Sequence, residues 1–452
     1  MSGSVAIVLA AGKGTRMKSR RPKVLHEVCG SSMLDHVLAA LRASGVSDIT
    51  AVVNPELRPA VEARGVETVV QDPQNGTGHA VALAMAARGG GSQPVLIVSA
   101  DMPLLSSTLV AEVVATRGRD DADLALVTAR VPLPTNFGRI VRAGQAIVKI
   151  VERADASPQE IEIDEVNAGV YCFDGRALLR HLRALRPNNA QGELYLTDCI
   201  AGIARDGGRI STVLWPDYRD VMGINTRIEL AAAREEMQRR ILDAHMLAGV
   251  TVIDPKGTYV DAGVSIEPDV TLFPQTHLRG TTAVATGCSV GPDTLIDDSA
   301  LGRDVTVTYS VVKDTRIGSG VSVGPFAHLR AGTVVEEGAH VGNFVELKKT
   351  RMGRRSKAGH LAYLGDATLG ENVNIGAGTI TCNYDGEKKH PTSIGEGAFI
   401  GSNSSLVAPV SVGKGALVGA GAVVIRDVAD RERVVGNPAR QLVKKTISPE
   451  PE

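Results

Sequence analysis

The sequence of 452 residues contains few cysteines, few aromatic residues and almost no net charge. The cysteines are odd in number and never form a C-x-x-C pair, which argues against a disulfide framework and against a cysteine zinc site. Lys and Arg total 49 against 50 Asp and Glu, so the chain has no overall basic field for nucleic acid. We therefore expect a reducing compartment and no nucleic-acid partner. The five cysteines are Cys29, Cys172, Cys199, Cys288 and Cys382.

Long apolar runs are also lacking. No stretch approaches the ~18 apolar residues of a membrane span, and no basic segment precedes the apolar residues that begin at Val5, as it would in a signal peptide. We expect a soluble cytoplasmic protein without a membrane partner. Its length exceeds that of one typical core, so two or three domains are expected.

A glycine-rich segment follows the first apolar run, residues 5–9, which is typical of a strand buried on both faces of a parallel sheet. Gly12 and Gly14 supply backbone freedom and leave room for main-chain N–H groups to surround phosphate. Arg16 and Lys23 bring two cations towards the same place. The pattern is neither a Walker A loop nor a dinucleotide fingerprint. It predicts a triphosphate site, although a simple turn is the alternative.

Strands and helices alternate through the first half of the chain. This βαβ rhythm predicts a doubly wound, Rossmann-like α/β domain, in which ligands bind at the carboxyl ends of the strands. The expected strands are residues 5–9, 49–53, 68–70 and 95–99, and the expected helices are residues 33–44 and 79–88.

Two polar motifs follow expected strands. Asp101 comes directly after residues 95–99, where it could cap a helix or bind Mg²⁺, which takes one or two protein oxygens together with phosphate oxygens. Residues 71–79, Q-D-P-Q-N-G-T-G-H, open the next helix, and a capped helix start is the alternative to a nucleotide contact.

The segment L-A-A-G-K-G-T-R-M, with Pro22 and Lys23, resembles the signature of the sugar-1-phosphate nucleotidyltransferases. The resemblance implies that Arg16 and Lys23 hold phosphates and that Asp101 and Asn225 bind Mg²⁺. It implies nucleotide contacts from Leu9, Ala10, Ala11, Gly12, Gly14, Lys23, Gln71, Gly76 and Thr77. The sugar contacts that it implies are Gly138, Glu152, Asn167, Tyr195 and Asn225.

The second half of the chain repeats an aliphatic residue every six positions. This period predicts a parallel β-helix, and the pattern resembles the left-handed hexapeptide-repeat transferases, which are typically trimers. We expect interruptions at residues 353–363 and 381–392, where functional residues would lie. The aliphatic positions are Val260, Ile266, Leu272, Leu278, Val284, Val290, Ile296, Ile317, Val323, Leu329, Val335, Val341, Leu347, Ile394, Ile400, Leu406, Val412, Val418 and Val424.

These patterns divide the chain into three parts. The two resemblances imply a sugar-1-phosphate nucleotidyltransferase domain over residues 1–226 and a left-handed β-helical transferase domain over 249–452, joined by a connecting helix over 227–248.

Across its length the chain resembles the bacterial bifunctional enzymes that join N-acetylglucosamine-1-phosphate uridyltransferase to glucosamine-1-phosphate acetyltransferase. The second half carries this resemblance in H-V-G-N-F-V-E-L-K-K, S-K-A-G-H-L-A-Y-L-G-D and N-I-G-A-G-T-I-T-C-N-Y-D-G. It implies that His360 is the general base, since an imidazole titrates near working pH. It also implies a homotrimer that uses UTP and acetyl-CoA to supply precursors of peptidoglycan and lipopolysaccharide.

The same resemblance assigns the acetyltransferase pocket. The implied sugar-phosphate contacts are Arg330, Lys348, Tyr363 and Asn374, and the implied acetyl-CoA contacts are Ala377, Asn383, Tyr384, Lys389, Ser402, Ala420 and Arg440. The chain departs from the family at Asn437, where an arginine for the CoA phosphates is common, so Arg440, Lys444 or Lys445 would replace it.

Three hypotheses follow from the sequence. The first is a bifunctional enzyme with one active site in each half. The second is a monofunctional sugar-1-phosphate nucleotidyltransferase whose β-helix serves only oligomerisation. The third is a purely structural or regulatory β-helix protein, and the presence of Arg16, Lys23, Asp101 and Asn225 together speaks against it.

Overall fold

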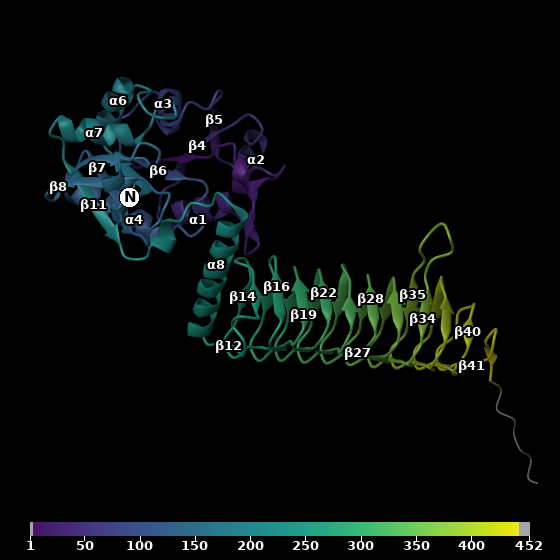
Figure 1. The fold of residues 1–452 in the computed structure, drawn as a ribbon. Helices are drawn as coiled ribbons and strands as arrows, with labels where there is room; N and C mark the ends of the chain where they lie inside the picture. The colour runs from purple at the N-terminus through teal and green to yellow at the C-terminus, as the bar shows by residue number, and fades with distance from the viewer. Residues whose placement is uncertain (1–2, 443–452) are drawn as a thin grey trace, which may run out of the picture. The chain divides into compact units, whose positions relative to one another are not determined.

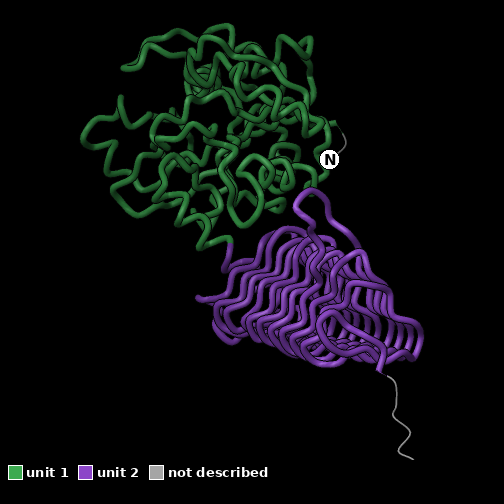
Figure 2. The backbone as a smooth tube through the Cα atoms, turned by 90° about the vertical axis from the view of Figure 1, so that its right-hand side faces the viewer, with its two compact units in different colours: residues 1–237 green, residues 238–452 purple. Residues whose placement is uncertain are grey.

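The computed structural model describes residues 3–442. By its internal contacts the chain divides after residue 237 into two compact units (Figure 2). The division falls within the long helix α8, Arg227–Leu247. The first part of α8 buries Leu230 and Ala233 in the first unit, whereas Leu242 joins the core of the second. Ile228, in the first turn of α8, is 83% exposed.

A mixed sheet forms the centre of the first unit. Its strand order is β11-β7-β10-β6-β1-β4-β5, with the β8–β9 hairpin attached to β10. Neighbours around β1 are parallel, and β10 runs antiparallel to β6 and β7. The strands are β1 Val5–Leu9, β4 Asp48–Val53, β5 Glu67–Val70, β6 Val95–Ser99, β7 Leu124–Arg130, β8 Arg139–Ala143, β9 Ala146–Val151, β10 Glu165–Phe173 and β11 Ile210–Trp215. A small hairpin joins β2 Glu27–Val28 to β3 Ser31–Ser32.

Helices cover both faces of this sheet (Figure 1). Alternate residues of β1 explain why: Ala6 and Val8 pack with α1 and α4, while Val5 and Ile7 pack with α3, α6 and α7. The predicted doubly wound fold is confirmed. The helices are α1 Met33–Ala43, α2 Arg58–Glu62, α3 Thr77–Ala87, α4 Ser107–Arg119, α5 Pro158–Ile161, α6 Gly175–Ala184 and α7 Thr197–Arg205, with short 3₁₀ turns η1 Thr15–Met17, η2 Lys23–Leu25 and η3 Tyr218–Val221.

Three parallel sheets form the second unit, whose coils stack as a left-handed parallel β-helix (Figure 1). The first sheet contains β12 Thr251–Val252, β15 Thr271–Leu272, β18 Ser289–Val290, β21 Thr306–Val307, β24 Ser322–Val323, β27 His340–Asn343, β30 Lys357–His360, β33 Asn374–Ile375, β36 Phe399–Ile400, β39 Leu417–Val418, β41 Arg433–Val435 and β42 Arg440–Gln441. Within it, β42 pairs antiparallel with β41.

The second sheet contains β13 Tyr259–Val260, β16 Thr276–Arg279, β19 Thr294–Asp297, β22 Val311–Lys313, β25 His328–Leu329, β28 Glu346–Lys348, β31 Tyr363–Gly365, β34 Ile380–Cys382, β37 Ser405–Val407 and β40 Val423–Val424. The third contains β14 Ser265–Ile266, β17 Ala283–Val284, β20 Ala300–Leu301, β23 Thr315–Ile317, β26 Thr333–Val335, β29 Arg351–Met352, β32 Ala367–Leu369, β35 Thr392–Ile394 and β38 Val410–Val412.

The aliphatic residues predicted from the six-residue period form the core of this unit. All of them are buried except Ile266, which is partly buried. The predicted interruption at residues 353–363 is wrong, because Met352, Ala358 and Leu364 are buried and continue the ladder. A corner shortened by one residue after Leu347 shifts the register, and the small side chain of Ala358 hides the period.

The second predicted interruption, at residues 381–392, is a protruding loop between β34 and β35. An antiparallel bridge between Tyr384 and Lys389 closes it, and the His390 backbone N–H donates to the Asn383 carbonyl at 2.8 Å. All five cysteines are free thiols. Among residues 3–442 no helix is both long and apolar enough to cross a membrane.

Candidate active sites

The glycine loop after β1 closes against η2. Gly14 has a φ of +61°, and a Cβ on it would lie 2.6 Å from the Lys23 Cβ, so this position requires glycine. Gly12 differs from the expectation of special backbone freedom, because it lacks a positive φ. No described atom lies within 4 Å of a Cβ built there, which leaves its backbone open to a ligand.

Lys23, Asp101 and Asn225 converge at the carboxyl end of the parallel strands. The Lys23 ammonium donates to the Asp101 carboxylate and, at 2.9 Å, to the Asn225 side-chain oxygen. The side chains of Lys23 and Asp101 are 13% and 12% exposed. A backbone bond from Ile224 N–H to the Asp101 carbonyl at 2.9 Å joins the two segments. Three residues separated by up to 202 positions thus form one cluster.

The start of α8 holds Asn225 in place. The Glu229 carboxylate accepts from the backbone N–H groups of Asn225 and Thr226 at 2.7 and 2.8 Å. The Thr226 hydroxyl accepts in return from the Glu229 N–H at 3.2 Å. This reciprocal pair is a capping box, which orders the residues that enter the helix.

The Asp101 and Asn225 oxygens fit a magnesium ion. Both bind one cation, the Lys23 ammonium, so they already point to a common position. Magnesium commonly takes only one or two protein ligands and completes its shell with water and phosphate. No cluster of three or more His, Cys, Asp or Glu side chains suited to a metal occurs among the described residues. A magnesium ion held by these two oxygens would need further ligands, such as phosphate oxygens.

The other predicted nucleotide contacts of this segment lie at the end of β1, in the loop and on η1. Leu9 ends β1, and Ala10 bonds through its N–H to the Val52 carbonyl at 2.8 Å. Arg16 lies exposed on η1, outside the Lys23 cluster. Ala11 is buried.

The segment that begins α3 packs against residues 194–196. The Gly78 N–H donates to the Leu194 carbonyl at 2.7 Å, and the Thr77 hydroxyl accepts from the Leu196 N–H at 3.0 Å. A Cβ on Gly76 would lie 2.5 Å from the same Leu194 carbonyl. Gln71 donates to the Gly76 carbonyl at 2.9 Å. The predicted base and sugar segments therefore form one wall.

The carboxyl group of Glu152 is largely enclosed beside Gly138, although the residue as a whole is only partly buried. A Cβ on Gly138 would lie 3.5 Å from both Glu152 carboxylate oxygens. The Thr197 hydroxyl donates to Glu152 at 3.3 Å. Burial raises the pKa of Glu152, and the nearby Asp155 and Asp198 raise it further. A carboxylate that is shielded from water in this way is stabilised by a ligand that donates hydrogen bonds to it.

Tyr195 and Asn167 complete this pocket. The Tyr195 hydroxyl is buried without a hydrogen-bond partner among the described residues, and burial raises its pKa to about 12. Asn167 donates to the Tyr171 hydroxyl at 2.6 Å. A bulge in β10, with Gly169 at a φ of +74°, brings these two side chains together. An unpaired hydroxyl beside a buried carboxyl is a site prepared for a polar ligand.

A row of cations marks the second unit. Parallel register aligns Arg330 with Lys348, one coil apart. The Arg330 guanidinium pairs with Glu346 at 2.8 Å. The neighbouring Lys348 lowers the pKa of Lys389, so the protruding loop brings a second amino group close to Lys348. Two adjacent cations form a site for an anion of phosphate size.

A second row follows the corner between the first and second sheets. His360 aligns with Asn343 of the preceding coil, and its Nδ1 forms a hydrogen bond with the Asn343 side-chain oxygen. The same register places Ala377, Ser402 and Ala420 at this corner in the following coils. The predicted base and three predicted acetyl-CoA contacts therefore share one row.

The remaining predicted residues lie around these rows. The Tyr363 hydroxyl and the Asn383 amide lie over Gly365, 2.5 and 2.6 Å from a Cβ built there, and Asn383 donates to Asp366 at 2.5 Å. Asn374 is half-buried on β33, while Tyr384, Ser402 and Arg440 are exposed. Of the three cations suggested for the CoA phosphates, Lys444 and Lys445 lie outside the described residues.

Sequence reasoning missed several members of these sites. Asn343, Glu346 and Asp366 each contact a predicted residue of a neighbouring coil. The coil length of 17 or 18 residues could have identified them, as the pairs Asn343↔His360 and Leu329↔Leu347 show. Tyr171 was not predicted as a site residue, because only a bulge in β10 brings it next to Asn167.

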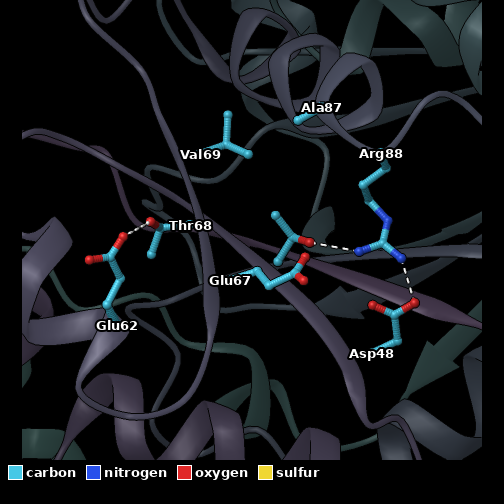
Figure 3. A pocket seen from close by; sticks show the side chains of 8 residues that line it. Asp48, Glu62, Glu67, Thr68, Val69, Ala87 and Arg88 are labelled. Atoms are coloured by element: carbon cyan, nitrogen blue, oxygen red, sulfur yellow. Dashed lines mark hydrogen bonds and ion pairs between the residues drawn. The ribbon is translucent and has the colours of Figure 1, made fainter.

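A separate hollow of about 520 Å³ lies beside β4 and β5 (Figure 3). Several of its polar groups bond to one another: Arg88 bonds to Asp48 and to Thr50, and Glu62 accepts from Thr68 at 2.8 Å. None of the predicted site residues lines it. We assign it no part in the chemistry.

Comparisons with known proteins match both units. Residues 6–198 match the MobA-like NTP transferase domain. Residues 314–349 match the bacterial transferase hexapeptide model, and residues 391–426 match the hexapeptide repeat of succinyl-transferase.

Curated relatives match along nearly the whole chain, and each is called "Bifunctional protein GlmU". The relative from Heliobacterium modesticaldum is 46% identical over 95% of this chain and 94% of its own. The relative from Streptomyces coelicolor is 45% identical over 94% and 90%, and that from Trichormus variabilis 42% identical over 97% of each chain. The resemblance stated from the sequence is therefore confirmed, and the chain belongs to the family of bifunctional GlmU proteins.

Proposed function

We propose that each half of this bifunctional transferase contains one complete active site. The second unit acetylates glucosamine 1-phosphate from acetyl-CoA, and the first unit transfers uridylyl from UTP to the resulting N-acetylglucosamine 1-phosphate. The product is UDP-N-acetylglucosamine, a precursor of peptidoglycan and lipopolysaccharide, made in the cytoplasm. The convergence of Lys23, Asp101 and Asn225 is the observation that carries the uridylyl transfer. The alignment of His360 with Asn343 on neighbouring coils is the observation that supports acetyl transfer.

His360 acts as the general base of acetyl transfer. A ring nitrogen of His360 takes a proton from the sugar amine while the amine nitrogen attacks the acetyl carbonyl carbon. The C–N bond forms, the C–S bond breaks, and the CoA thiolate leaves and can receive the proton from the imidazolium. Arg330 and Lys348 hold the sugar phosphate, because the strand register places them one coil apart. Lys389, on the protruding loop, completes this pocket beside Lys348.

In uridylyl transfer a phosphate oxygen of N-acetylglucosamine 1-phosphate attacks the α-phosphorus of UTP, and pyrophosphate leaves. No protein nucleophile is required, so positioning and charge stabilisation supply the catalysis. Lys23 and Arg16 offset the charge that develops on the phosphates. Lys23 bonds to the oxygens of Asp101 and Asn225, and it can exchange these for phosphate oxygens when substrate arrives.

Asp101 and Asn225 would hold the Mg²⁺ ion. When bound, the ion neutralises phosphate charge and orients the triphosphate. Glu152, Asn167 and Tyr195 would bind the sugar, since its hydroxyl and acetamide groups can satisfy the buried carboxyl and the unpaired Tyr195 hydroxyl.

The β-helix also supplies a surface for a homotrimer. Phe326 and Phe344 are 54% and 55% exposed, and their rings stack at 5.3 Å. Tyr309 lies 5.6 Å from Phe326, and Leu361 continues the exposed row beside His360. Exposed apolar rows of this kind favour burial against another copy. A trimer assembled along this row would bring a second chain next to His360.

Two substitutions test the division of labour in the full chain. His360→Ala should lower acetyl transfer by about 10²-fold or more while uridylyl transfer persists. Asp101→Asn should lower uridylyl transfer while acetyl transfer persists. It should also raise the Mg²⁺ concentration needed for half-maximal uridylyl transfer, because one ligand charge is lost. A chain that shows no acetyl transfer before substitution would favour the monofunctional alternative, with the β-helix serving only assembly.

A further inference from the structure

The surroundings of His360 restrict which of its two ring nitrogens carries the proton. Neutral imidazole has one N–H donor and one acceptor nitrogen, and only the acceptor can serve as a base. The Asn343 side-chain oxygen lies in hydrogen-bond contact with His360 Nδ1. A carbonyl oxygen only accepts hydrogen bonds, so Nδ1 must carry the proton and Nε2 must hold the lone pair.

The backbone holds this contact in register. Asn343 and His360 are paired residues of neighbouring parallel strands, and the Leu361 N–H donates to the Asn343 carbonyl at 3.0 Å. A Cβ on Gly342 would lie 2.0 Å from the Gly359 carbonyl, so the two coils touch directly beside the pair. Two strand ends fixed in this way leave the side chains little freedom to separate.

The coil on the other side of His360 carries no competing polar side chain at this corner. Register places Ala377 there, with only a methyl group. His340 on β27 lies near His360, since burial, Lys357 and His360 together lower the pKa of His340. Neither Lys357 nor His340 offers an acceptor anion that would stabilise a protonated imidazole. The neutral amide of Asn343 therefore sets the tautomer without adding negative charge.

We propose that Asn343 is a positioning residue for acetyl transfer, which holds His360 as the Nδ1–H tautomer and so presents Nε2 as the base. This inference rests on the proposed role of His360. It adds a residue that touches neither substrate and acts only through the imidazole ring.

Two substitutions in the full chain test the proposal. Asn343→Leu keeps the size of the side chain and removes the acceptor, so kcat for acetyl transfer should fall about tenfold or more while the KM for glucosamine 1-phosphate changes little. Asn343→Asp keeps the acceptor and adds a charge, which should retain activity and move the acid limb of the pH–rate profile to higher pH. Uridylyl transfer by the same samples reports whether each variant is folded.

The ¹⁵N chemical shifts of the His360 ring measure the tautomer without reference to activity. The His360 signals are assigned by their loss from the spectrum of His360→Ala. We expect a protonated Nδ1 in the native chain and in Asn343→Asp, and a proton moved to Nε2 in Asn343→Leu. An unchanged tautomer in Asn343→Leu, or unchanged kcat, would overturn the proposal. Acetyl transfer that survives His360→Ala would instead overturn the role of His360 itself.

Discussion

At the scale of single residues, both sites keep polar groups unsatisfied. Glu152 is a buried carboxyl with a raised pKa, and the Tyr195 hydroxyl beside it is without a partner among the described side chains. In the second unit Lys348 and Lys389 lie close together despite their like charges. Each arrangement costs stability in the unliganded chain. Each is relieved by the ligand that we assign to it, a sugar in the first case and a phosphate in the second.

The variant Glu152→Gln should be more stable than the native chain at pH 7 yet less active. Burial raises the pKa of Glu152 above its unfolded value, so stability falls as pH rises through the window between the two values. Glutamine has no such dependence. Its advantage in Tm should therefore shrink as pH falls below the folded pKa. Uridylyl transfer should drop about tenfold, since a charged hydrogen-bond acceptor is lost.

Thermal scans at several pH values, combined with uridylyl-transfer rates, check this expectation. Glu56→Gln is the matched control, because Glu56 is exposed on the same unit. The assignment of Glu152 would fail if Glu152→Gln retained full activity, or if its Tm relative to the native chain were independent of pH.

At the scale of elements, the sequence predicted what local periods determine. Strand ends of a parallel sheet meet at one edge, so the approach of Asp101 to the glycine loop could be anticipated. The six-residue ladder could also be predicted, because its period is visible in the sequence itself. The five-residue step from Leu347 to Met352 concealed one coil, and the partner of His360 lay 17 residues away at Asn343. Coil length and bulges are set by packing between distant segments, which no local pattern records.

The variant Gly14→Ala should abolish uridylyl transfer without affecting acetyl transfer. The added Cβ would lie 2.6 Å from the Lys23 Cβ at a φ that disfavours side chains, so the loop or Lys23 must move. Gly118→Ala is the control, since a Cβ there meets no described atom within 4 Å. Initial rates of both reactions should be measured on each variant. Normal uridylyl transfer by Gly14→Ala would show that the tight approach of the loop to Lys23 is dispensable.

At the scale of the whole molecule, two folds with unrelated cores occupy one chain. We propose the nucleotide site at the strand ends of the doubly wound sheet and the acetyl-transfer site along the corners of the stacked β-helix. Each hydrophobic core consists of residues of its own unit. Substitutions in one unit should therefore leave the chemistry of the other intact, apart from effects that act through assembly.

The variant Phe344→Glu should reduce the trimer to smaller species and lower acetyl transfer. A carboxylate in the exposed aromatic row would be buried without a partner on assembly. Light scattering after size exclusion gives the mass. Leu214→Glu serves as the control, because Leu214 is 54% exposed on β11 of the first unit. A Phe344→Glu chain that remains trimeric would refute this interface.

The central claim is that the β-helix is a second active site. Thiol release from acetyl-CoA by the full chain, with glucosamine 1-phosphate present or omitted, tests it most directly. We predict release that requires the amino sugar and disappears in His360→Ala, while uridylyl transfer continues in the same sample. Absence of sugar-dependent release from a chain that still transfers uridylyl would contradict the account and leave the β-helix as a scaffold.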